Sequence, residues 1–223
     1  MKLLFTAVVC LLISYTAFSQ NQFGIFVGPQ ATTAGYTINS IKQKNSYKIG
    51  FQAGATMKVP FEGNLYFSPA AFYSYKGYKV DFNQFVTPPG PEALNNNTGI
   101  HTFEIAPMLQ VDFGKGANRF FVKGGPTLDF QLSGTEKFDT VNGSVSRKMK
   151  WGYSNYGRFS ANAIIQLGYE TSGGFFIFGH YSFGLTSINN ADFGPKIRHK
   201  VFGISIGKYL HKGKITMDTR NKE

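Results

Sequence analysis

Cysteine is almost absent from this sequence of 223 residues, which holds only Cys10. The N-terminus reads as an export signal, with Lys2 as the positive region, an apolar stretch from Leu3 to Ile13, and small residues at Ala17 and Ser19. We expect cleavage after Ser19, which removes the only thiol. An exported chain without cysteine has no disulfide, no reactive thiol and no thiolate-bound metal.

Long hydrophobic runs are also missing. No segment after residue 20 has eighteen consecutive apolar residues, so a membrane-spanning helix is excluded there. If the chain crosses a membrane, it must do so as a closed β-barrel, because every backbone polar group in lipid needs an internal partner. Helical periodicity is weak, and the 16% aromatic content with 26 Gly favours strands.

Acidic residues are scarce, with 12 Asp and Glu against 23 Lys and Arg, a net charge of +11. A basic chain can bind nucleic acid, but an exported one is not expected to meet it. The expected partners are therefore anionic lipid headgroups of the outer membrane, including lipopolysaccharide, and no nucleic acid.

Apolar and polar residues alternate with period two along much of the chain, which is typical of strands. Eight segments carry this pattern: 22–30, 46–60, 64–78, 100–113, 118–132, 157–170, 174–187 and 197–210. We expect one face of each strand to contact lipid and the other to face the lumen. The pattern places Phe51, Ile105 and Leu128 on lipid, and Gln52, Glu104 and Asp129 inside.

Short and long connections alternate between these segments. The links 61–64, 114–118 and 171–174 are tight and contain Gly, whereas 31–45, 79–99, 133–156 and 188–196 are long. Outer-membrane barrels have this asymmetry, with long loops outside and short turns in the periplasm. The sequence therefore predicts an all-β fold, a closed up-and-down antiparallel transmembrane barrel of about eight strands over residues 20–210. A signal peptide at 1–19 precedes it, and a C-terminal periplasmic tail at 211–223 follows.

Aromatic residues cluster near the expected strand ends, as interface girdles should. Those near the long links are Tyr73, Tyr75, Trp151, Tyr153 and Tyr156, and those near the short turns are Phe61, Phe67, Phe113, Phe120, Tyr169, Phe175 and Tyr209. A soluble exported ligand-binding barrel also alternates, with its apolar face inward. The girdles and the loop asymmetry favour the membrane barrel over that alternative.

Motifs for catalysis or metal binding lack their structural context. Residues 203–207 match G-x-S-x-G, but a nucleophile elbow needs a strand-to-helix turn and this stretch lies inside an alternating strand. The four histidines form neither H-x-x-x-H nor H-E-x-x-H. We therefore expect no enzyme activity, no cofactor and no metal site.

Charged residues of both signs share the expected interior. They are Lys48, Lys58, Glu104, Asp112, Arg119, Lys123, Asp129, Arg158 and Glu170. In a narrow barrel we expect them to form an ion-pair network that fills the lumen. An open channel and an active site are the alternatives for this set.

Basic residues also gather beside the long links: Lys42, Lys44, Lys76, Lys79, Arg147, Lys148, Lys150, Lys196, Arg198 and Lys200. They are suited to the phosphate groups of lipopolysaccharide, although an ordinary solvated rim has the same composition. Within the longest links, the expected binding residues are Arg147, Lys148, Lys150, Trp151, Tyr153 and Tyr156, because Tyr and Trp beside Arg and Lys suit sugar or phosphate contacts. Nothing in these links suggests a buried core.

Several segments are similar to those of a known family. The stretches FSPAAFYSYKGYKV (67–80), HTFEIAPMLQVDF (101–113), FFVKGGPTLDFQL (120–132), HYSFGLTSI (180–188) and KVFGISIGKYL (200–210) together resemble the PorT-like outer-membrane β-barrel family. The resemblance implies the fold and a location in the outer membrane. One branch of that family serves protein secretion, which implies an envelope or secretion protein as a partner.

We therefore expect a non-enzymatic, multi-pass outer-membrane barrel whose long extracellular loops do structural or binding work. A narrow transport pore is the first alternative. An outer-membrane lipid-modifying enzyme and a soluble exported binder are the others.

Overall fold

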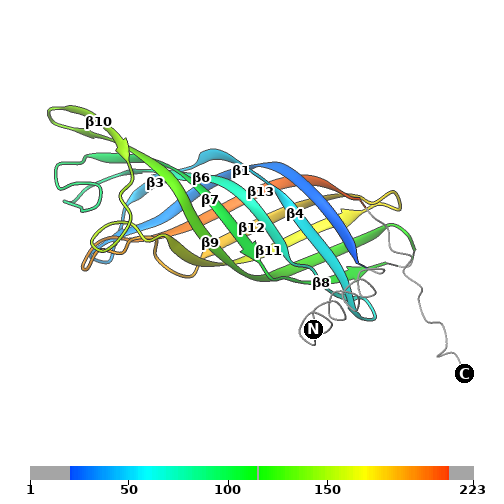
Figure 1. Ribbon diagram of the computed structural model, residues 1–223. Coiled ribbons are helices and arrows are strands. Elements are labelled where there is room, and N and C mark those ends of the chain that lie inside the picture. The colour runs from blue at the N-terminus through cyan, green and yellow to red at the C-terminus, as the bar shows by residue number, and fades with distance from the viewer. Residues whose placement is uncertain (1–20, 115, 211–223) are drawn as a thin grey trace, which may run out of the picture.

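The computed structural model describes residues 21–114 and 116–210, so the expected leader at 1–19 and tail at 211–223 lie outside the described residues. The strands wind around one axis as a tilted barrel (Figure 1). They are β1 (Gln22–Ile38), β2 (Ile41–Lys42), β3 (Lys44–Ser46), β4 (Lys48–Glu62), β5 (Leu65–Phe67), β6 (Ala70–Asp81), β7 (Asn95–Ala106), β8 (Leu109–Phe113), β9 (Arg119–Thr140), β10 (Gly143–Lys148), β11 (Phe159–Glu170), β12 (Phe175–Gly184) and β13 (Lys196–Tyr209). Within these ranges, no helix is long and apolar enough to cross a membrane.

Eight antiparallel strands close into a ring in the order β1, β4, β6, β7, β9, β11, β12, β13. The first and last strands pair from Gly24 with Tyr209 to Thr37 with Lys196, which closes the barrel. β5 continues the line of β6, and β8 that of β7. The breaks between them contain Pro69 and Pro107, which have no N–H to donate to a neighbouring strand. The predicted all-β, eight-stranded fold is confirmed.

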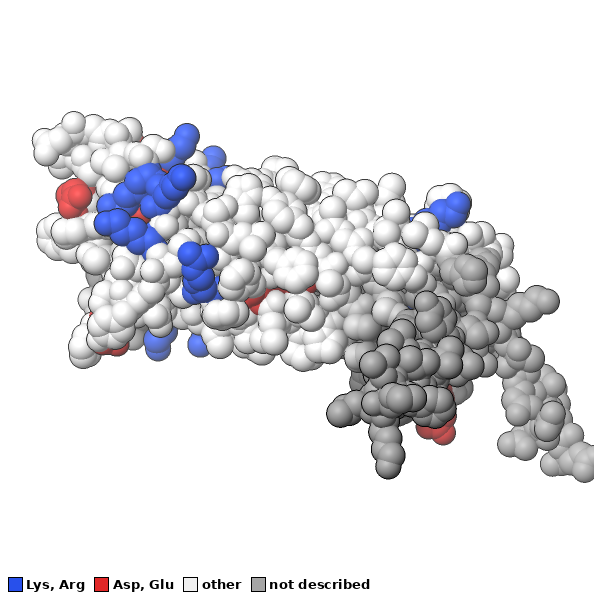
Figure 2. Space-filling model, in the orientation of Figure 1, with Lys and Arg blue, Asp and Glu red and all other residues white. Residues whose placement is uncertain are grey.

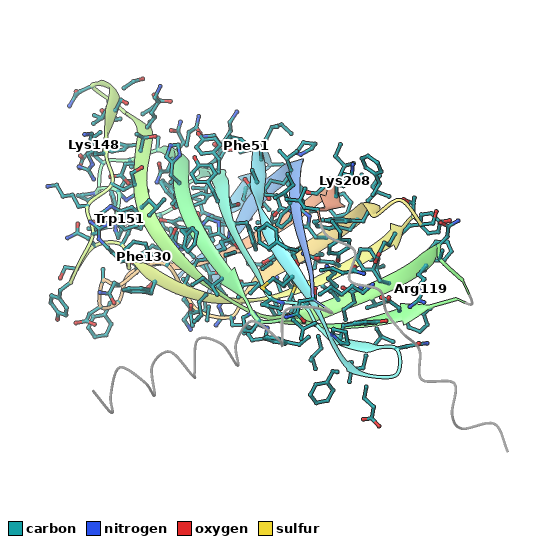
Figure 3. The ribbon with its side chains drawn as sticks, turned by 45° about the vertical axis from the view of Figure 1, so that its right-hand side comes forward. Phe51, Arg119, Phe130, Lys148, Trp151 and Lys208 are labelled. Carbon is teal, nitrogen blue, oxygen red and sulfur yellow. The ribbon has the colours of Figure 1, made fainter. Side chains whose placement is uncertain are left out.

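Side chains alternate between the outer wall and the lumen as the sequence predicts. Phe51, Ile105 and Leu128 are 47%, 51% and 61% exposed on the outer wall. Their chain neighbours Gln52, Glu104 and Asp129 are 2%, 2% and 1% exposed, because they point into the barrel. Figure 3 shows Phe51 and Phe130 pointing away from the wall. An apolar outer wall around a polar lumen is the arrangement of a membrane barrel.

The short links all lie at one end of the barrel. They join β4 to β5, β8 to β9 and β11 to β12, as the sequence predicts. The two ends of the described chain meet there as well, since the Leu210 N–H donates to the Phe23 carbonyl at 2.7 Å.

The long links are more ordered than the sequence predicts. β1 runs on to Ile38, β7 already begins at Asn95, and β9 continues to Thr140 before it returns as β10. These segments form a sheet that projects beyond the barrel (Figure 1). The interpretation of these residues as loops was wrong. Their outer face meets water and carries polar residues such as Thr135, Lys137 and Asp139. The alternation of apolar and polar residues that marks a strand in lipid is therefore missing here. We call residues 33–46, 78–100, 133–158 and 185–199 the extension.

The extension has its own apolar core, contrary to the sequence-based expectation. Its members come from strands and links alike: Ala34, Tyr36, Ile38, Tyr78, Val80, Val86, Ile100, Met149, Tyr156, Ile188 and Ile197. A second apolar cluster fills the lumen nearer the short links, with Phe26, Phe72, Phe121, Phe176 and Phe178 among its members. Both ends of the lumen are therefore packed with apolar side chains.

Three residues assigned to the aromatic girdles lie elsewhere, and one of them, Trp151, packs against the core of the extension. Tyr209 points into the lumen and is 3% exposed, and Tyr156 is buried in the core of the extension at 1% exposed. The alternation of β13 directs Tyr209 inward, whereas Tyr156 lies in the link between β10 and β11 and packs into the core of the extension. Aromatic type alone predicted their position wrongly.

Candidate functional site

One ion cluster lies in the lumen near the short links. Lys58 Nζ is 2.6 Å from Asp112 Oδ2 and 2.7 Å from Glu170 Oε2, and Arg119 is 3.7 Å from the same Asp112 oxygen. Gln110 Nε2 donates to the other Asp112 oxygen at 2.6 Å. These residues come from β4, β8, β9 and β11, so the cluster ties separate walls of the barrel together.

A second ion cluster lies farther along the lumen. Lys76 Nζ is 2.7 Å from Glu104 Oε1 and 2.8 Å from Asp129 Oδ2, and all three side chains are almost fully buried. The sequence placed Lys76 with the basic residues beside the long links, and that placement was wrong. The signal was present, since Lys76 has the same parity in β6 as the inward-facing Phe72 and Ser74.

Lys48 was assigned to the lumen, but its side chain lies on the outer wall. The pairing register with β6 changes by one residue between Ser46 and Phe51, which turns Lys48 outward in the manner of a β-bulge. Its Nζ donates to Asn97 Oδ1 and to the Thr98 carbonyl, both at 3.0 Å. The alternation of β4 by itself could not reveal this change of register.

Lys123 and Arg158 do not join the ion clusters either. Lys123 is buried, with its Nζ 5.0 Å from the ring centroid of Phe121, and it forms no ion pair within the part of the chain that the structure describes. Arg158 is exposed just before β11, and its guanidinium lies over Trp151, 5.6 Å from the ring centroid. The remaining members of the predicted set lie within the two clusters.

The candidate binding residues of the long links mostly hold the extension together. Arg147 Nε is 2.6 Å from Glu136 Oε1, and a further N–H of the same guanidinium donates to the Pro89 carbonyl. The Tyr156 hydroxyl donates to Glu136 Oε2 at 2.9 Å. Burial raises the pKa of Tyr156 well above its usual value, and Tyr78 and Glu136 add to the effect, so the phenol stays protonated as a donor.

The other four candidates of this set are divided between the core and the surface. Trp151 packs against the core of the extension. Tyr153 is 75% exposed, and its hydroxyl donates to Asp192 Oδ2 at 2.6 Å. Lys148 and Lys150 are exposed to solvent. Lys148 and Trp151 lie at one end of the molecule, and Arg119 and Lys208 lie at the other (Figure 3). The structure therefore does not gather the six predicted residues into one surface.

A groove opens at the tip of the extension, which the sequence did not indicate. Its volume is about 880 Å³. Its walls are the 82–94 link, Asn39, and the turn between β9 and β10. We call it the tip groove. Phe85 and Val141 on its rim are 85% and 88% exposed. Large apolar side chains in water at the end of a rigid support are features of a docking surface.

The G-x-S-x-G stretch does not form a nucleophile elbow. Ser205 lies within β13, is 1% exposed, and accepts a hydrogen bond from Gln52 Nε2 at 3.0 Å. Over residues 21–114 and 116–210, no cluster of three or more His, Asp or Glu residues could hold a metal ion.

Structural comparison finds small outer-membrane barrels. OprG from Pseudomonas aeruginosa aligns with 15% identity and a TM-score of 0.49, over 86% of this chain and 97% of its own. Ail from Yersinia pestis, in complex with the heparin analogue sucrose octasulfate, aligns with 12% identity and a TM-score of 0.44, over 85% and 98%. The outer membrane enzyme PagL aligns with 12% identity and a TM-score of 0.45, over 83% and 99%.

No curated protein sequence matches this one significantly. The model of a protein family described as outer membrane protein β-barrel domain matches residues 18–190, most of the chain. The closed antiparallel ring and its apolar outer wall agree with that match. The chain belongs to the outer membrane protein β-barrel domain family and resides in the outer membrane.

Proposed function

We propose that this protein is a non-enzymatic binding protein of the outer membrane, which holds a surface partner with the tip groove of its extension. A cleaved signal peptide at residues 1–19 exports it, and it is a member of the PorT-like branch. The segments quoted from the sequence support that branch, and the export pattern of the N-terminus supports the cleavage.

The exposed apolar rim of the tip groove carries the proposal. Phe85 and Val141 come from different links, yet they border one hollow. Leu94, which is 52% exposed, lies in the same wall. Covering such residues recovers about 25 cal/mol for each Å² of apolar surface removed from water. The partner that fits is a protein of the envelope that presents apolar side chains.

The rigidity of the extension supports the same function. Glu136 binds Arg147 and Tyr156 at once, and Arg147 also reaches the 82–94 link through Pro89. The tip groove is therefore held by a packed scaffold, and binding costs little ordering of flexible loops.

The filled lumen disfavours the transport pore. Two ion clusters and two apolar clusters occupy it along its length. Eight strands leave space for little more than side chains. We expect no single-channel conductance from the protein in planar bilayers, and a steady open level would favour the pore instead. The burial of Ser205 likewise disfavours a lipid-modifying enzyme. Turnover of lipid by the purified protein would favour the enzyme instead.

Photo-crosslinking in living cells tests the binding role. A photoreactive residue at position 141 should give a discrete adduct of higher mass, and Phe85→Asp should abolish that adduct. The matched control is a photoreactive residue at position 193, because Phe193 is at least as exposed as Val141 but lies outside the tip groove. Equal adducts at both positions, or none at 141, would reject the proposal.

A further inference from the structure

A second hollow, on the outer face where the extension joins the barrel, is lined by basic side chains. Lys196, Arg198 and Lys200 occupy alternate positions of β13 and are exposed, whereas Ile197 and His199 between them are buried. Lys42 of β2 lies in the same row as Lys196, because Thr37 of β1 pairs with both. The hollow has a volume of about 420 Å³. We call it the basic hollow.

No acidic residue lines the basic hollow. None of its four cations forms an ion pair within 4.0 Å in the portion of the chain that the structure describes. Alternate residues of a strand are about 6.6 Å apart, so the charges of β13 repel one another. An anion bound among them relieves this repulsion.

Two glycines flank Arg198 and leave space above the wall. Gly35 pairs with Arg198 from β1. On the other side, a Cβ at Gly184 would lie 3.1 Å from the Arg198 Cβ. Side chains at these two positions would occupy the hollow. Their absence lets a bulky anionic group approach the guanidinium.

The basic hollow begins where the lipid-facing surface ends. Next along the outer face of β13 come Phe202, Ile204 and Ile206, which are 56%, 51% and 60% exposed, and then Lys208. Lys200 and Lys208 are eight residues apart, or about 20 Å across the membrane at the usual strand tilt. That distance approaches the apolar band of about 25 Å in such barrels.

The basic hollow therefore lies in the headgroup layer on the side of the long links, which is the outer leaflet. Lys and Arg gather at that end of the molecule and are sparse along the middle of the visible face (Figure 2). The lipid of this leaflet in a Gram-negative outer membrane is lipopolysaccharide, whose lipid anchor carries phosphate groups.

We propose that Lys42, Lys196, Arg198 and Lys200 bind the phosphorylated headgroup of one lipopolysaccharide molecule. The Arg198 guanidinium donates two parallel hydrogen bonds to a phosphate, and the ammonium groups around it add charge-assisted bonds. The acyl chains lie along Phe202 and Phe183, which pairs with Lys200. This surface lies where the extension joins the barrel and shares no residue with the tip groove, so it goes beyond the proposed function.

The opposite wall provides a matched control. Lys79 and Lys137 are exposed on β6 and β9, and each pairs with Asn97 of β7. Lys48 also reaches Asn97, so this wall is basic, but Asp81 and Asp139 line its hollow, whereas no acidic residue lines the basic hollow. Loss of Lys79 and Lys137 therefore removes the same positive charge from the protein but leaves the basic hollow unchanged.

The test measures how much lipopolysaccharide remains bound to the purified full-length protein in detergent, by native mass spectrometry. The variant R198Q/K200Q should retain at least tenfold less lipopolysaccharide than the unchanged protein. The variant K79Q/K137Q, with the same loss of charge, should stay within twofold. Enzymatically dephosphorylated lipopolysaccharide should bind the unchanged protein as weakly as intact lipopolysaccharide binds R198Q/K200Q.

Three results would overturn the proposal. The first is an equal loss in both variants, which would mean attraction by net charge alone. The second is undiminished binding of dephosphorylated lipopolysaccharide, a measurement that needs no variant to fold. The third is equal retention of phosphatidylglycerol at the same concentration, which would assign the basic hollow to any anionic lipid.

Discussion

At the scale of single residues, neighbouring positions of one strand have opposite surroundings. Leu128 faces outward and Asp129 is buried in the lumen. Leu128→Arg places a charge in the apolar band and should lower the free energy of unfolding in lipid by about 2–4 kcal/mol. Val141→Arg is the control, since Val141 is also exposed but lies at the tip in water, and its effect should stay within about 0.5 kcal/mol. Denaturant titration in lipid vesicles measures both, and equal effects would contradict the assigned membrane band.

Lys76 neutralises two buried carboxylates, so its removal leaves two negative charges uncompensated in the lumen. Lys76→Met leaves Glu104 and Asp129 without their cation and should cost about 3–5 kcal/mol of unfolding free energy. Lys79→Met, on the same strand but exposed, should change it by less than about 0.5 kcal/mol. The same titration compares them. Similar stabilities for the two variants would mean that the ion pairs of Lys76 contribute nothing.

Residue-level placement was predictable only where the strand alternation continues unbroken. It placed Glu104 and Asp129 correctly in the lumen, but it could not place Lys48, because the register change beside β3 depends on how two strands pair. Lys76 was missed for another reason, since a lysine near a long link resembles a rim residue by composition. A charged side chain can be buried only where counter-ions neutralise it, and the counter-ions of Lys76 lie on other strands.

At the scale of elements, the extension behaves as a small packed sheet supported by the barrel. Tyr156 is at the centre of its core and also binds Glu136. Tyr156→Ala should destabilise the extension locally by about 3–5 kcal/mol while the barrel stays folded. The expected result is faster proteolysis within residues 149–158, whereas the migration of the unheated protein on gels should not change.

Tyr153→Ala is the matched control, because Tyr153 lies three residues away but is exposed. It should leave the proteolysis rate of the extension unchanged. If both variants were cleaved at the same rate, or if Tyr156→Ala unfolded the whole barrel, the extension would not be a separate packed unit.

The eight strands and short turns could be predicted because lipid on one side and lumen on the other impose a strict period of two. The extension could not, because its outer face meets water and its inner face is a mixture of aromatic and polar residues. β9 illustrates this: Leu128 and Phe130 mark the membrane part, whereas Glu136 and Phe138 both point inward beyond it. The tip groove arises from links distant in sequence, which no local pattern indicates.

At the scale of the whole molecule, the outward direction of the apolar face separates a membrane barrel from a soluble one. Single cysteines at positions 126 to 131, introduced one at a time with Cys10→Ser, can carry spin labels in the protein within outer-membrane vesicles. Labels at 126, 128 and 130 should collide with oxygen dissolved in lipid, and those at 127, 129 and 131 should not. The reverse pattern would contradict the outward direction of the apolar face. So would access of a water-soluble relaxation agent to positions 128 and 130 as great as its access to 127, 129 and 131.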